Sequence, residues 1–260
     1  MCKNIGEKNC LKEYSAVYDE WEALEIIERV PEIEIINDAY YLPHRPVFKV
    51  SSTIKVSPVF RALARDGNGL SLNAYLYRGP NLRELILDVL DRFRTYPIAL
   101  SADIEKDFLQ ISVTPEHRNF LKFSYNHEND EAVNRHCRVV FGMCSNPFLL
   151  AVTISDLLDN TLSEYVDFVL KLRHSFYIDN CVTGVSNVQE IESFVSKARE
   201  MISKGCFNLR GWESNVRNKA IFKYEGDTNV LSLVWNLDRD SLKCSVNNEI
   251  LEKLTEMTKR

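Results

Sequence analysis

Hydrophobic residues recur at helical spacing in several segments of the chain. Residues 12–29 place apolar side chains at every third or fourth position above an acidic outer face, which predicts an amphipathic helix. Residues 81–96 repeat this spacing, and Asn81 is expected to cap that helix. Residues 187–205 form another such helix with Gly205 as its C-terminal cap. A charged helix is expected over residues 249–260.

Shorter apolar and β-branched runs lie between these helices and predict strands. They cover residues 40–60, the start of 97–113, the start of 135–165 before a long apolar helix, and two hairpins at 176–185 and 229–246. Asp179-Asn180 is expected to form the two-residue turn of the first hairpin, because both residue types tolerate positive φ. Since helices alternate with strands and hairpins, the pattern indicates an α+β or mixed α/β fold.

Bulk properties narrow the class of protein. The 260 residues are 45% hydrophobic and 27% charged, which suits one large domain or two lobes of roughly 100 to 150 residues. No apolar run approaches the roughly 18 residues of a membrane span and the N-terminus lacks a signal-peptide core, so we expect an intracellular protein, cytoplasmic or nuclear, without membrane contact. The seven cysteines contain no C-x-x-C pair, which indicates reduced thiols.

The charge balance counts against one class of partner. The formal net charge is −5, whereas nucleic-acid-binding proteins usually carry a basic footprint. A local groove can still be positive on an acidic protein, so nucleic-acid binding is not excluded.

Two carboxylates follow apolar strand segments. Asp103 comes after the run "PIALSA", and Asp179 lies in the later hairpin. If both strands belong to one sheet, the two side chains could hold Mg²⁺, which binds a few carboxylates together with substrate phosphates and water. Two such ions could activate an attacking hydroxyl and stabilise a leaving pyrophosphate. The alternative is that Asp103 caps a helix and Asp179-Asn180 is only a turn.

Seven blocks of sequence support the first interpretation. In order they read "YYLPHRPVFK", "GLSLNAYLYRGPNL", "ALSADIEKDFLQI", "RVVFGMCSNPFLL", "FYIDN", "GCFNLRGWESN" and "VLSLVWNLDRDSL". With these blocks in the right order, the chain resembles, over nearly its whole length, the reverse transcriptases of Pao/BEL-type LTR retrotransposons.

This resemblance implies an α+β fold with the fingers and palm of a right-hand polymerase, in which an antiparallel palm sheet packs on helices. Residues 1–95 would form an N-terminal helix and a fingers-like region, residues 96–235 the palm, and residues 236–260 the start of a truncated connection segment. The implied activity is that of an RNA-directed DNA polymerase, a nucleotidyltransferase that uses Mg²⁺ or Mn²⁺. Its partners would be an RNA or DNA primer-template and a dNTP.

The resemblance also implies roles for individual residues. Asp103, Asp179 and Asn180 would form the catalytic group, with the backbone carbonyl of Ile104 as a further metal ligand. The nucleotide would be bound by Phe108, Gly142 and Pro147, and Tyr177 would contact the primer. Arg65 would also bind the nucleotide, in partial compensation for the cation that Ser57 replaces. Simpler roles stay open: Phe108 as a core aromatic, Pro147 as a first helical turn and Tyr177 as a strand residue.

Several residues depart from the pattern of the family. The resemblance expects Asp-Asp where this chain has Asp179-Asn180, and an asparagine carries no charge. Ser57 and Gly211 stand where the family has cations. Two hypotheses follow: a polymerase domain whose two-metal chemistry is impaired by Asn180, or a non-catalytic relic or domesticated module that binds nucleic acid or protein.

Overall fold

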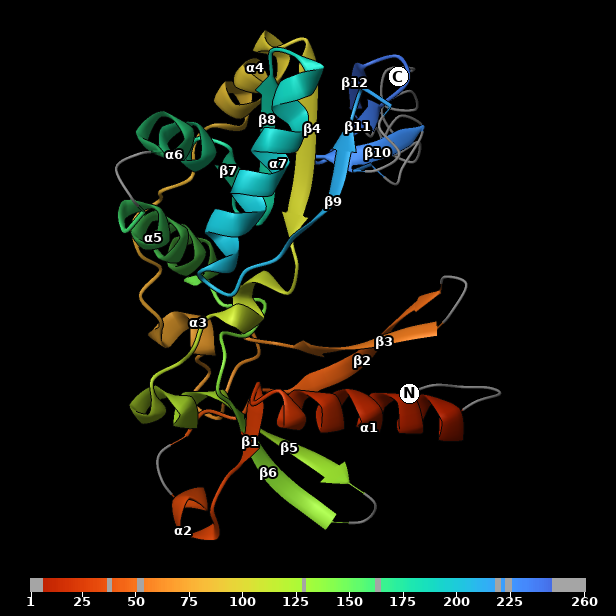
Figure 1. Cartoon of the computed structure of the whole chain (residues 1–260). Helices are drawn as coiled ribbons and strands as arrows, with labels where there is room; N and C mark the ends of the chain where they lie inside the picture. The colour runs from red at the N-terminus through yellow and green to blue at the C-terminus, as the bar shows by residue number, and fades with distance from the viewer. Residues whose placement is uncertain are drawn as a thin grey trace, which may run out of the picture. The chain divides into compact units, whose positions relative to one another are not determined.

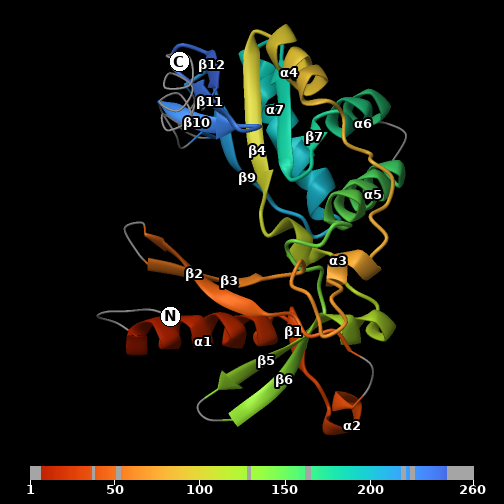
Figure 2. The same cartoon turned by 180° about the vertical axis from the view of Figure 1, so that it is seen from behind.

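The computed structural model describes residues 7–36, 39–50, 54–127, 130–161, 165–217, 221–222 and 226–244. The chain forms two compact units, each assembled from two stretches of sequence. Unit 1 comprises Met1–Leu82 and Lys106–Leu150, and unit 2 comprises Arg83–Glu105 and Ala151–Arg260. Their elements are labelled in Figure 1 and seen from behind in Figure 2.

Unit 1 combines helices with two small antiparallel sheets. One sheet has the order β1-β6-β5, and the other is the hairpin β2-β3. Its elements are α1 (Glu7–Ala23), β1 (Ile27–Arg29), α2 (Glu32–Ile35), β2 (His44–Val50), β3 (Ile54–Phe60), α3 (Leu72–Tyr75), the 3₁₀ helices η1 (Asp107–Gln110) and η2 (Pro115–Leu121), β5 (Lys122–His127), β6 (Asp130–His136) and the first turn of α5 (Asn146–Asp159).

The core of unit 1 is aromatic. Tyr14, Tyr18 and Trp21 lie on one face of α1 because they are spaced by four and three residues, and all three are buried. Phe60 and Phe123 of the two sheets pack against each other with ring centroids 5.1 Å apart, and Phe123 also contacts Tyr18. Through these contacts both sheets pack against α1.

Unit 2 is built on a four-stranded antiparallel sheet with the order β7-β8-β4-β9. A three-stranded sheet, β10-β11-β12, adjoins it in the same unit. The elements are α4 (Ile86–Thr95), β4 (Ile98–Ile104), the part of α5 from Ala151 onward, α6 (Val166–Arg173), β7 (Phe176–Tyr177), β8 (Asn180–Val185), α7 (Val188–Ser203), β9 (Leu209–Ser214), β10 (Asp227–Val230), β11 (Leu233–Asn236) and β12 (Ser241–Cys244).

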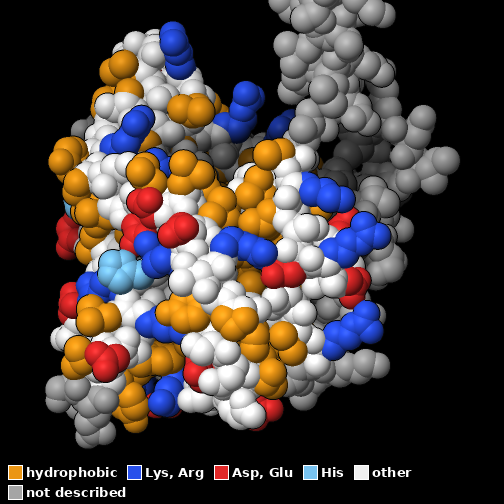
Figure 3. All heavy atoms as spheres, turned by 90° about the horizontal axis from the view of Figure 1, so that it is seen from above, with side chains coloured by type: hydrophobic (Ala, Val, Ile, Leu, Met, Phe, Trp, Pro, Cys, Tyr) orange, Lys and Arg blue, Asp and Glu red, His pale blue; other side chains and the backbone are white. Residues whose placement is uncertain are grey.

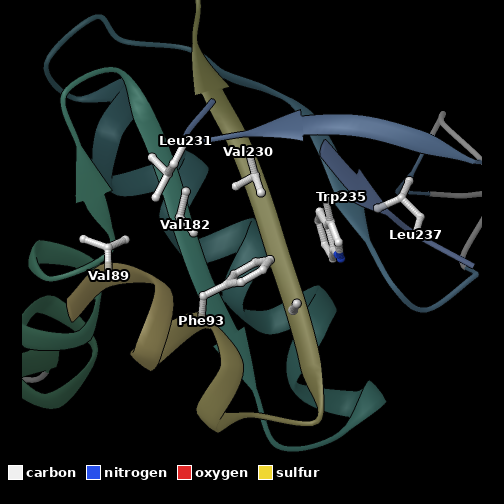
Figure 4. Close-up of a cluster of buried hydrophobic side chains, with 8 residues drawn as sticks. Val89, Phe93, Val182, Val230, Leu231, Trp235 and Leu237 are labelled. Carbon is white, nitrogen blue, oxygen red and sulfur yellow. The ribbon is translucent and has the colours of Figure 1, made fainter. Parts of the chain in front are cut away.

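The two faces of the four-stranded sheet are covered by different elements. Ala99 and Val182 point to one face, where they join a buried cluster with α4 and the β10-β11-β12 sheet (Figure 4). Phe93 of α4 and Trp235 of β11 meet edge to face in this cluster, with ring centroids 4.9 Å apart. Trp212 of β9 is also buried and contacts Phe194 of α7. Both tryptophans are therefore core residues.

Most predicted elements are present, but three helix ends differ. The first helix ends at Ala23 and residues 27–29 form a strand, because Glu25 adopts a φ of 53°. The second starts at Ile86 rather than at Asn81, and its N-cap is Leu85 without a side-chain hydrogen bond. At the end of α7 the positive φ of 62° belongs to Cys206 and not to Gly205.

The strands agree better with the expectation. Residues 40–60 contain the β2-β3 hairpin, β4 occupies the start of 97–113, and β11-β12 form the expected hairpin within 229–246. The expected helix at 249–260 lies outside the described residues. Residues 106–150 belong to unit 1, and the division at residues 95 and 235 stays a prediction.

Two further observations concern the charges on the surface and the length of the helices. On the face seen in Figure 3, Lys and Arg side chains are interspersed with Asp, Glu and hydrophobic side chains. Within the part of the chain that the structure describes, no helix is both long and apolar enough to cross a membrane.

Candidate catalytic and metal-binding site

The antiparallel pairing of β4 with β8 brings the two candidate carboxylates to one end of the sheet of unit 2. Asp103 pairs with Asn180 in the strand register, and Tyr177 pairs with Asn180 across the hairpin. The backbone N–H of Ile104 donates to the carbonyl oxygen of Asp179 at 2.9 Å. The structure therefore brings together two segments that are far apart in sequence, one with Asp103 and Ile104 and the other with Tyr177, Asp179 and Asn180.

The hairpin turn is shifted by one residue from the expected position. Because Tyr177 and Asn180 are paired, the two loop residues are Ile178 and Asp179. Ile178 adopts a φ of 57°, which is strained for a β-branched residue. Asn180 consequently begins β8, and its side chain lies on the same face of the sheet as that of Asp103.

The carboxyl group of Asp103 lies in a mixed electrostatic environment. Partial burial of the group raises its pKa, and the negative charge of Asp179 raises the pKa further. Arg210, which pairs with Asp103 on β9, acts in the opposite direction. The Arg210 guanidinium also donates to Glu105 at 2.6 Å. The carboxylates of Asp103 and Asp179 repel each other, and a divalent cation bound between them would relieve this repulsion.

Asn180 makes a direct contact with its neighbour. Its amide nitrogen donates to Oδ1 of Asp179 at 2.8 Å. An aspartate at this position would be a further carboxylate and could not donate in its ionised form. With asparagine at position 180, the site therefore lacks the negative charge that an aspartate would bring. The Asn180 amide also forms a hydrogen bond with a carboxylate oxygen of Asp179 that a metal ion would use.

Gly211 is placed by a β-bulge in β9. The register shifts between the pairs Ser101–Glu213 and Asp103–Arg210, so Gly211 and Trp212 lie opposite the single residue Ala102. Gly211 has a φ of 63°, as the left-handed residue of such a bulge requires. A Cβ atom at Gly211 would meet nothing within 4 Å, so the cost of a substitution at this Cβ is backbone strain.

The four expected nucleotide-binding residues belong to unit 1, whereas the carboxylates belong to unit 2. Phe108 is buried and packs edge to face on Phe141, with ring centroids 5.1 Å apart. Arg65 is exposed and forms an isolated bridge with Ser71. Gly142 has a φ of 93° and its carbonyl accepts from Asn73 at 2.9 Å, and Pro147 lies in the first turn of α5.

Tyr177 also has a structural role. It packs against the buried cluster that includes Phe93 and Trp235. This packing matches the simpler interpretation of Tyr177 as a strand residue and leaves its contact with a primer as a proposal.

Sequence reasoning did not select Arg210 or Glu213, although both lie on the same face as Asp103. Glu213 pairs with Ser101, two residues before Asp103, and its carboxylate accepts from the Thr228 hydroxyl at 2.7 Å. Buried positions recur in "LRGWES" with an interruption at Arg210 and Gly211, which are both exposed, but the partner strand of this segment could not be inferred from the pattern.

The site residues fit a divalent ion that binds together with a substrate. Among the described residues, no cluster of three or more His, Cys, Asp or Glu side chains is arranged to hold a metal. Mg²⁺ is commonly held by one or two carboxylates, with substrate phosphates and water as the remaining ligands. Asp103 and Asp179 can provide that pair.

Comparisons with known proteins identify the fold. No family model matches the chain, and no curated protein matches it. The foamy viral protease-reverse transcriptase dRH in complex with double-stranded DNA matches 98% of this chain and 38% of its own, with 13% identity and a TM-score of 0.64. The foamy viral protease-reverse transcriptase bound to dsDNA matches 98% of this chain and 44% of its own, with 14% identity and a TM-score of 0.60.

A third structure gives the same result. The foamy viral protease-reverse transcriptase in complex with an RNA/DNA hybrid matches 97% of this chain and 29% of its own, with 13% identity and a TM-score of 0.62. The chain thus spans less than half the length of each of these three proteins. Likeness at this level of identity concerns the fold, and the chain accordingly has a reverse-transcriptase-like α+β fold.

Proposed function

We propose that the chain is the reverse-transcriptase-like domain of a Pao/BEL-type retrotransposon, an RNA-directed DNA polymerase whose nucleotidyl transfer is weakened by Asn180. The observation that carries this proposal is the pairing of Asp103 with Asn180, which places Asp103 and Asp179 at one end of an antiparallel sheet. The fold shared with the foamy viral proteins supports it. The sequence blocks support the Pao/BEL type.

The carboxylates of Asp103 and Asp179 would hold Mg²⁺ or Mn²⁺, with the backbone carbonyl of Ile104 as a further ligand. When bound, such ions lower the pKa of an attacking hydroxyl and stabilise a leaving pyrophosphate. The protein itself orients the two carboxylates through the β4-β8 register and the Ile104–Asp179 hydrogen bond. Both constraints come from the backbone, so Asn180 leaves them intact.

The remaining residues would bind the substrates, which are a dNTP and an RNA or DNA primer-template. Arg65 would contact the triphosphate, since it is exposed and cationic. Phe108 would form an apolar wall beside the sugar, and Tyr177 would support the primer end. Gly142 and Pro147 would place the start of α5 against the nucleotide and the template.

Asn180 should reduce activity without unfolding the site. At an effective dielectric constant near 20, one pair of unit charges 4 Å apart is worth about 4 kcal/mol. If that stabilisation is lost only in the transition state, the rate falls by roughly a thousandfold. The hydrogen bond from Asn180 to Asp179 adds to this effect because it competes with metal binding at Oδ1.

The same hydrogen bond favours a second candidate function, a non-catalytic module that binds nucleic acid or protein. With Oδ1 of Asp179 occupied and Arg210 opposite Asp103, the acidic end of the sheet is partly neutralised without a metal ion. The fold could then persist as a relic or a domesticated binding module.

Primer extension on a homopolymer template tests the proposal. The chain would be compared with the variants Asn180→Asp and Asp179→Ala, first with Mg²⁺ and then with Mn²⁺. We expect slow incorporation by the unmodified chain that disappears in Asp179→Ala. Asn180→Asp should increase the rate, but only in part, because Ser57 and Gly211 still lack positive charge.

The other outcomes separate the two functions. Incorporation only after Asn180→Asp would mean that the fold persists around a silent metal site. Absence of incorporation in all variants would contradict the polymerase proposal and leave the binding module. Incorporation that survives Asp179→Ala would show that the chemistry lies elsewhere.

A further inference from the structure

Glu213 is a further carboxylate near the same end of the sheet. It lies on β9, where it pairs with Ser101, while Asp103 lies two residues further along β4. Side chains two residues apart on a strand share a face, and cross-strand partners share that face as well. Glu213 and Asp103 are therefore diagonal neighbours on that face, on either side of the register shift in β9.

The β-bulge produces this placement. In a regular strand Glu213 and Arg210, which are three residues apart, would point to opposite faces. The extra residue at Gly211 corrects the alternation, so that Glu213, Arg210 and Asp103 all share one face while Trp212 remains buried on the other. The bulge thus brings one more negative charge toward the site.

The carboxylate of Glu213 is partly shielded from solvent and is fixed by a hydrogen bond. Its side chain is half-buried, and the Thr228 hydroxyl of β10 fixes one of its oxygens at 2.7 Å. Partial burial raises the pKa of Glu213, and the charge of Asp103 raises the pKa further. The Arg210 guanidinium on the same face donates to Glu105.

We infer that Glu213 supplies the third negative charge of the metal site, the one that Asn180 lacks, and acts on the bound ion through intervening water. This inference rests on the proposed metal-dependent function. Direct coordination is not required, since a charge at diagonal distance still attracts a divalent ion across a few ångströms of partly shielded space. Glu213 is thus a positioning and electrostatic residue, and Asp103 and Asp179 remain the ligands.

Mn²⁺ binding provides a test that does not depend on polymerase activity. Free Mn²⁺ would be measured by electron paramagnetic resonance during titration of the unmodified chain and of three variants, Glu213→Gln, Asp179→Asn and Glu200→Gln. Glu200 is the matched control, because it is an exposed glutamate on α7 of the same unit. We expect Glu213→Gln to weaken Mn²⁺ binding by about tenfold, with Asp179→Asn weaker still and Glu200→Gln unchanged.

A compensating variant distinguishes an electrostatic role from a loss of structure. Adding Asn180→Asp to Glu213→Gln returns a carboxylate to the same end of the sheet, so Mn²⁺ affinity should recover to at least that of the unmodified chain. A merely structural defect in Glu213→Gln would not be repaired by a charge at position 180. Thr228→Val, which removes the hydrogen bond to Glu213, should weaken binding by a smaller factor than Glu213→Gln.

The outcomes separate this inference from the proposed function. If Asp179→Asn weakens Mn²⁺ binding but Glu213→Gln does not, the role of Glu213 is refuted and the metal site stands. If the unmodified chain and the Asn180→Asp variant both bind no Mn²⁺, the metal-dependent function and the role of Glu213 are both refuted. Failure of the double variant to recover affinity would also overturn the inference.

Discussion

At the residue scale, the hairpin tip is the most constrained point of the candidate site. Ile178 adopts a φ of 57°, although the left-handed region costs an L-residue about 1 to 2 kcal/mol. Strain of this kind persists only where surrounding structure enforces it, and here the β7-β8 and β4-β8 pairings do so. The conformation places Asp179 in the loop and Asn180 in the strand.

The strain predicts an unusual order of stability at position 178. We expect Ile178→Gly to be more stable than Ile178→Ala by about 1 kcal/mol, because glycine adopts positive φ without a steric penalty. Both variants remove the isoleucine side chain, so the comparison isolates the backbone. Urea unfolding of the two variants measures the difference. An alanine variant as stable as the glycine variant would argue against the strained turn.

His136 links the stability of unit 1 to pH. Its ring is fully buried, and neither ring nitrogen has a hydrogen-bond partner among the described residues. Burial, together with a smaller effect of the nearby His44, lowers the pKa of His136 from 6.5 to about 3. The unfolded chain therefore binds a proton at a higher pH than the folded chain, so stability is full above about pH 6.5 and is lost as the pH falls toward 3.

This linkage can be isolated with His136→Phe. Below pH 6.5 the unmodified chain should lose up to about 1.4 kcal/mol per pH unit through this one residue, in addition to losses that other groups cause. His136→Phe should lack that component, whereas a control at the exposed His117, His117→Gln, should keep it. Urea midpoints at pH 7.5, 6 and 5 would show the difference. Parallel slopes for all three proteins would contradict the assignment.

At the scale of elements, the sheet of unit 2 depends on close approach between β8 and its neighbours. A Cβ atom at Gly184 would lie 2.6 Å from Cβ of Tyr96 and 3.0 Å from the carbonyl oxygen of Ile98. Both atoms belong to rigid parts of the fold, so neither can move without displacing the chain. Gly184 thus sets how closely β8 can approach the segment that leads into β4.

Gly184→Ala should therefore lower the free energy of unfolding by about 1 to 3 kcal/mol through overpacking. Gly67→Ala is the matched control, because a Cβ at Gly67 would meet nothing within 4 Å and its φ is not positive. That control should be neutral or slightly stabilising. Thermal unfolding of both variants gives the answer, and an unaffected Gly184→Ala protein would mean that β8 can shift.

At the scale of the whole molecule, an acidic chain must concentrate its positive charge locally to bind nucleic acid. The net charge is −5, so attraction cannot come from the overall balance. If the proposed binding of a primer-template is correct, affinity should fall steeply between about 50 and 200 mM salt. Fluorescence anisotropy with a labelled primer-template measures this slope.

Arg65→Ala should then reduce the salt slope by about one, the contribution of a single phosphate contact. Arg239→Ala, which removes an exposed arginine between β11 and β12, serves as the control and should leave the slope unchanged. Binding without a salt slope would exclude phosphate contacts. Absence of binding at any salt concentration would leave a protein partner as the remaining form of the module hypothesis.

Much of the architecture could be read from local patterns. The apolar runs predicted β4, the β11-β12 hairpin and α7, because burial on one face imposes a period on the sequence that needs no knowledge of the partner. Helix ends were less predictable. Asn81 looked like a cap, yet α4 starts at Ile86, because the ends of a helix depend on where the chain meets other elements.

The candidate site divides in the same way. The sequence alone determined the identity of Asp103 and Asp179, their position at the ends of apolar strand segments, and the absence of a charge at Asn180. Only the tertiary structure decided that Asp103 pairs with Asn180, that Ile178 and Asp179 form the turn, and that a bulge at Gly211 turns Glu213 toward the same face. Strand register and bulges arise from contacts between segments that are distant in sequence, so a local sequence pattern does not predict them.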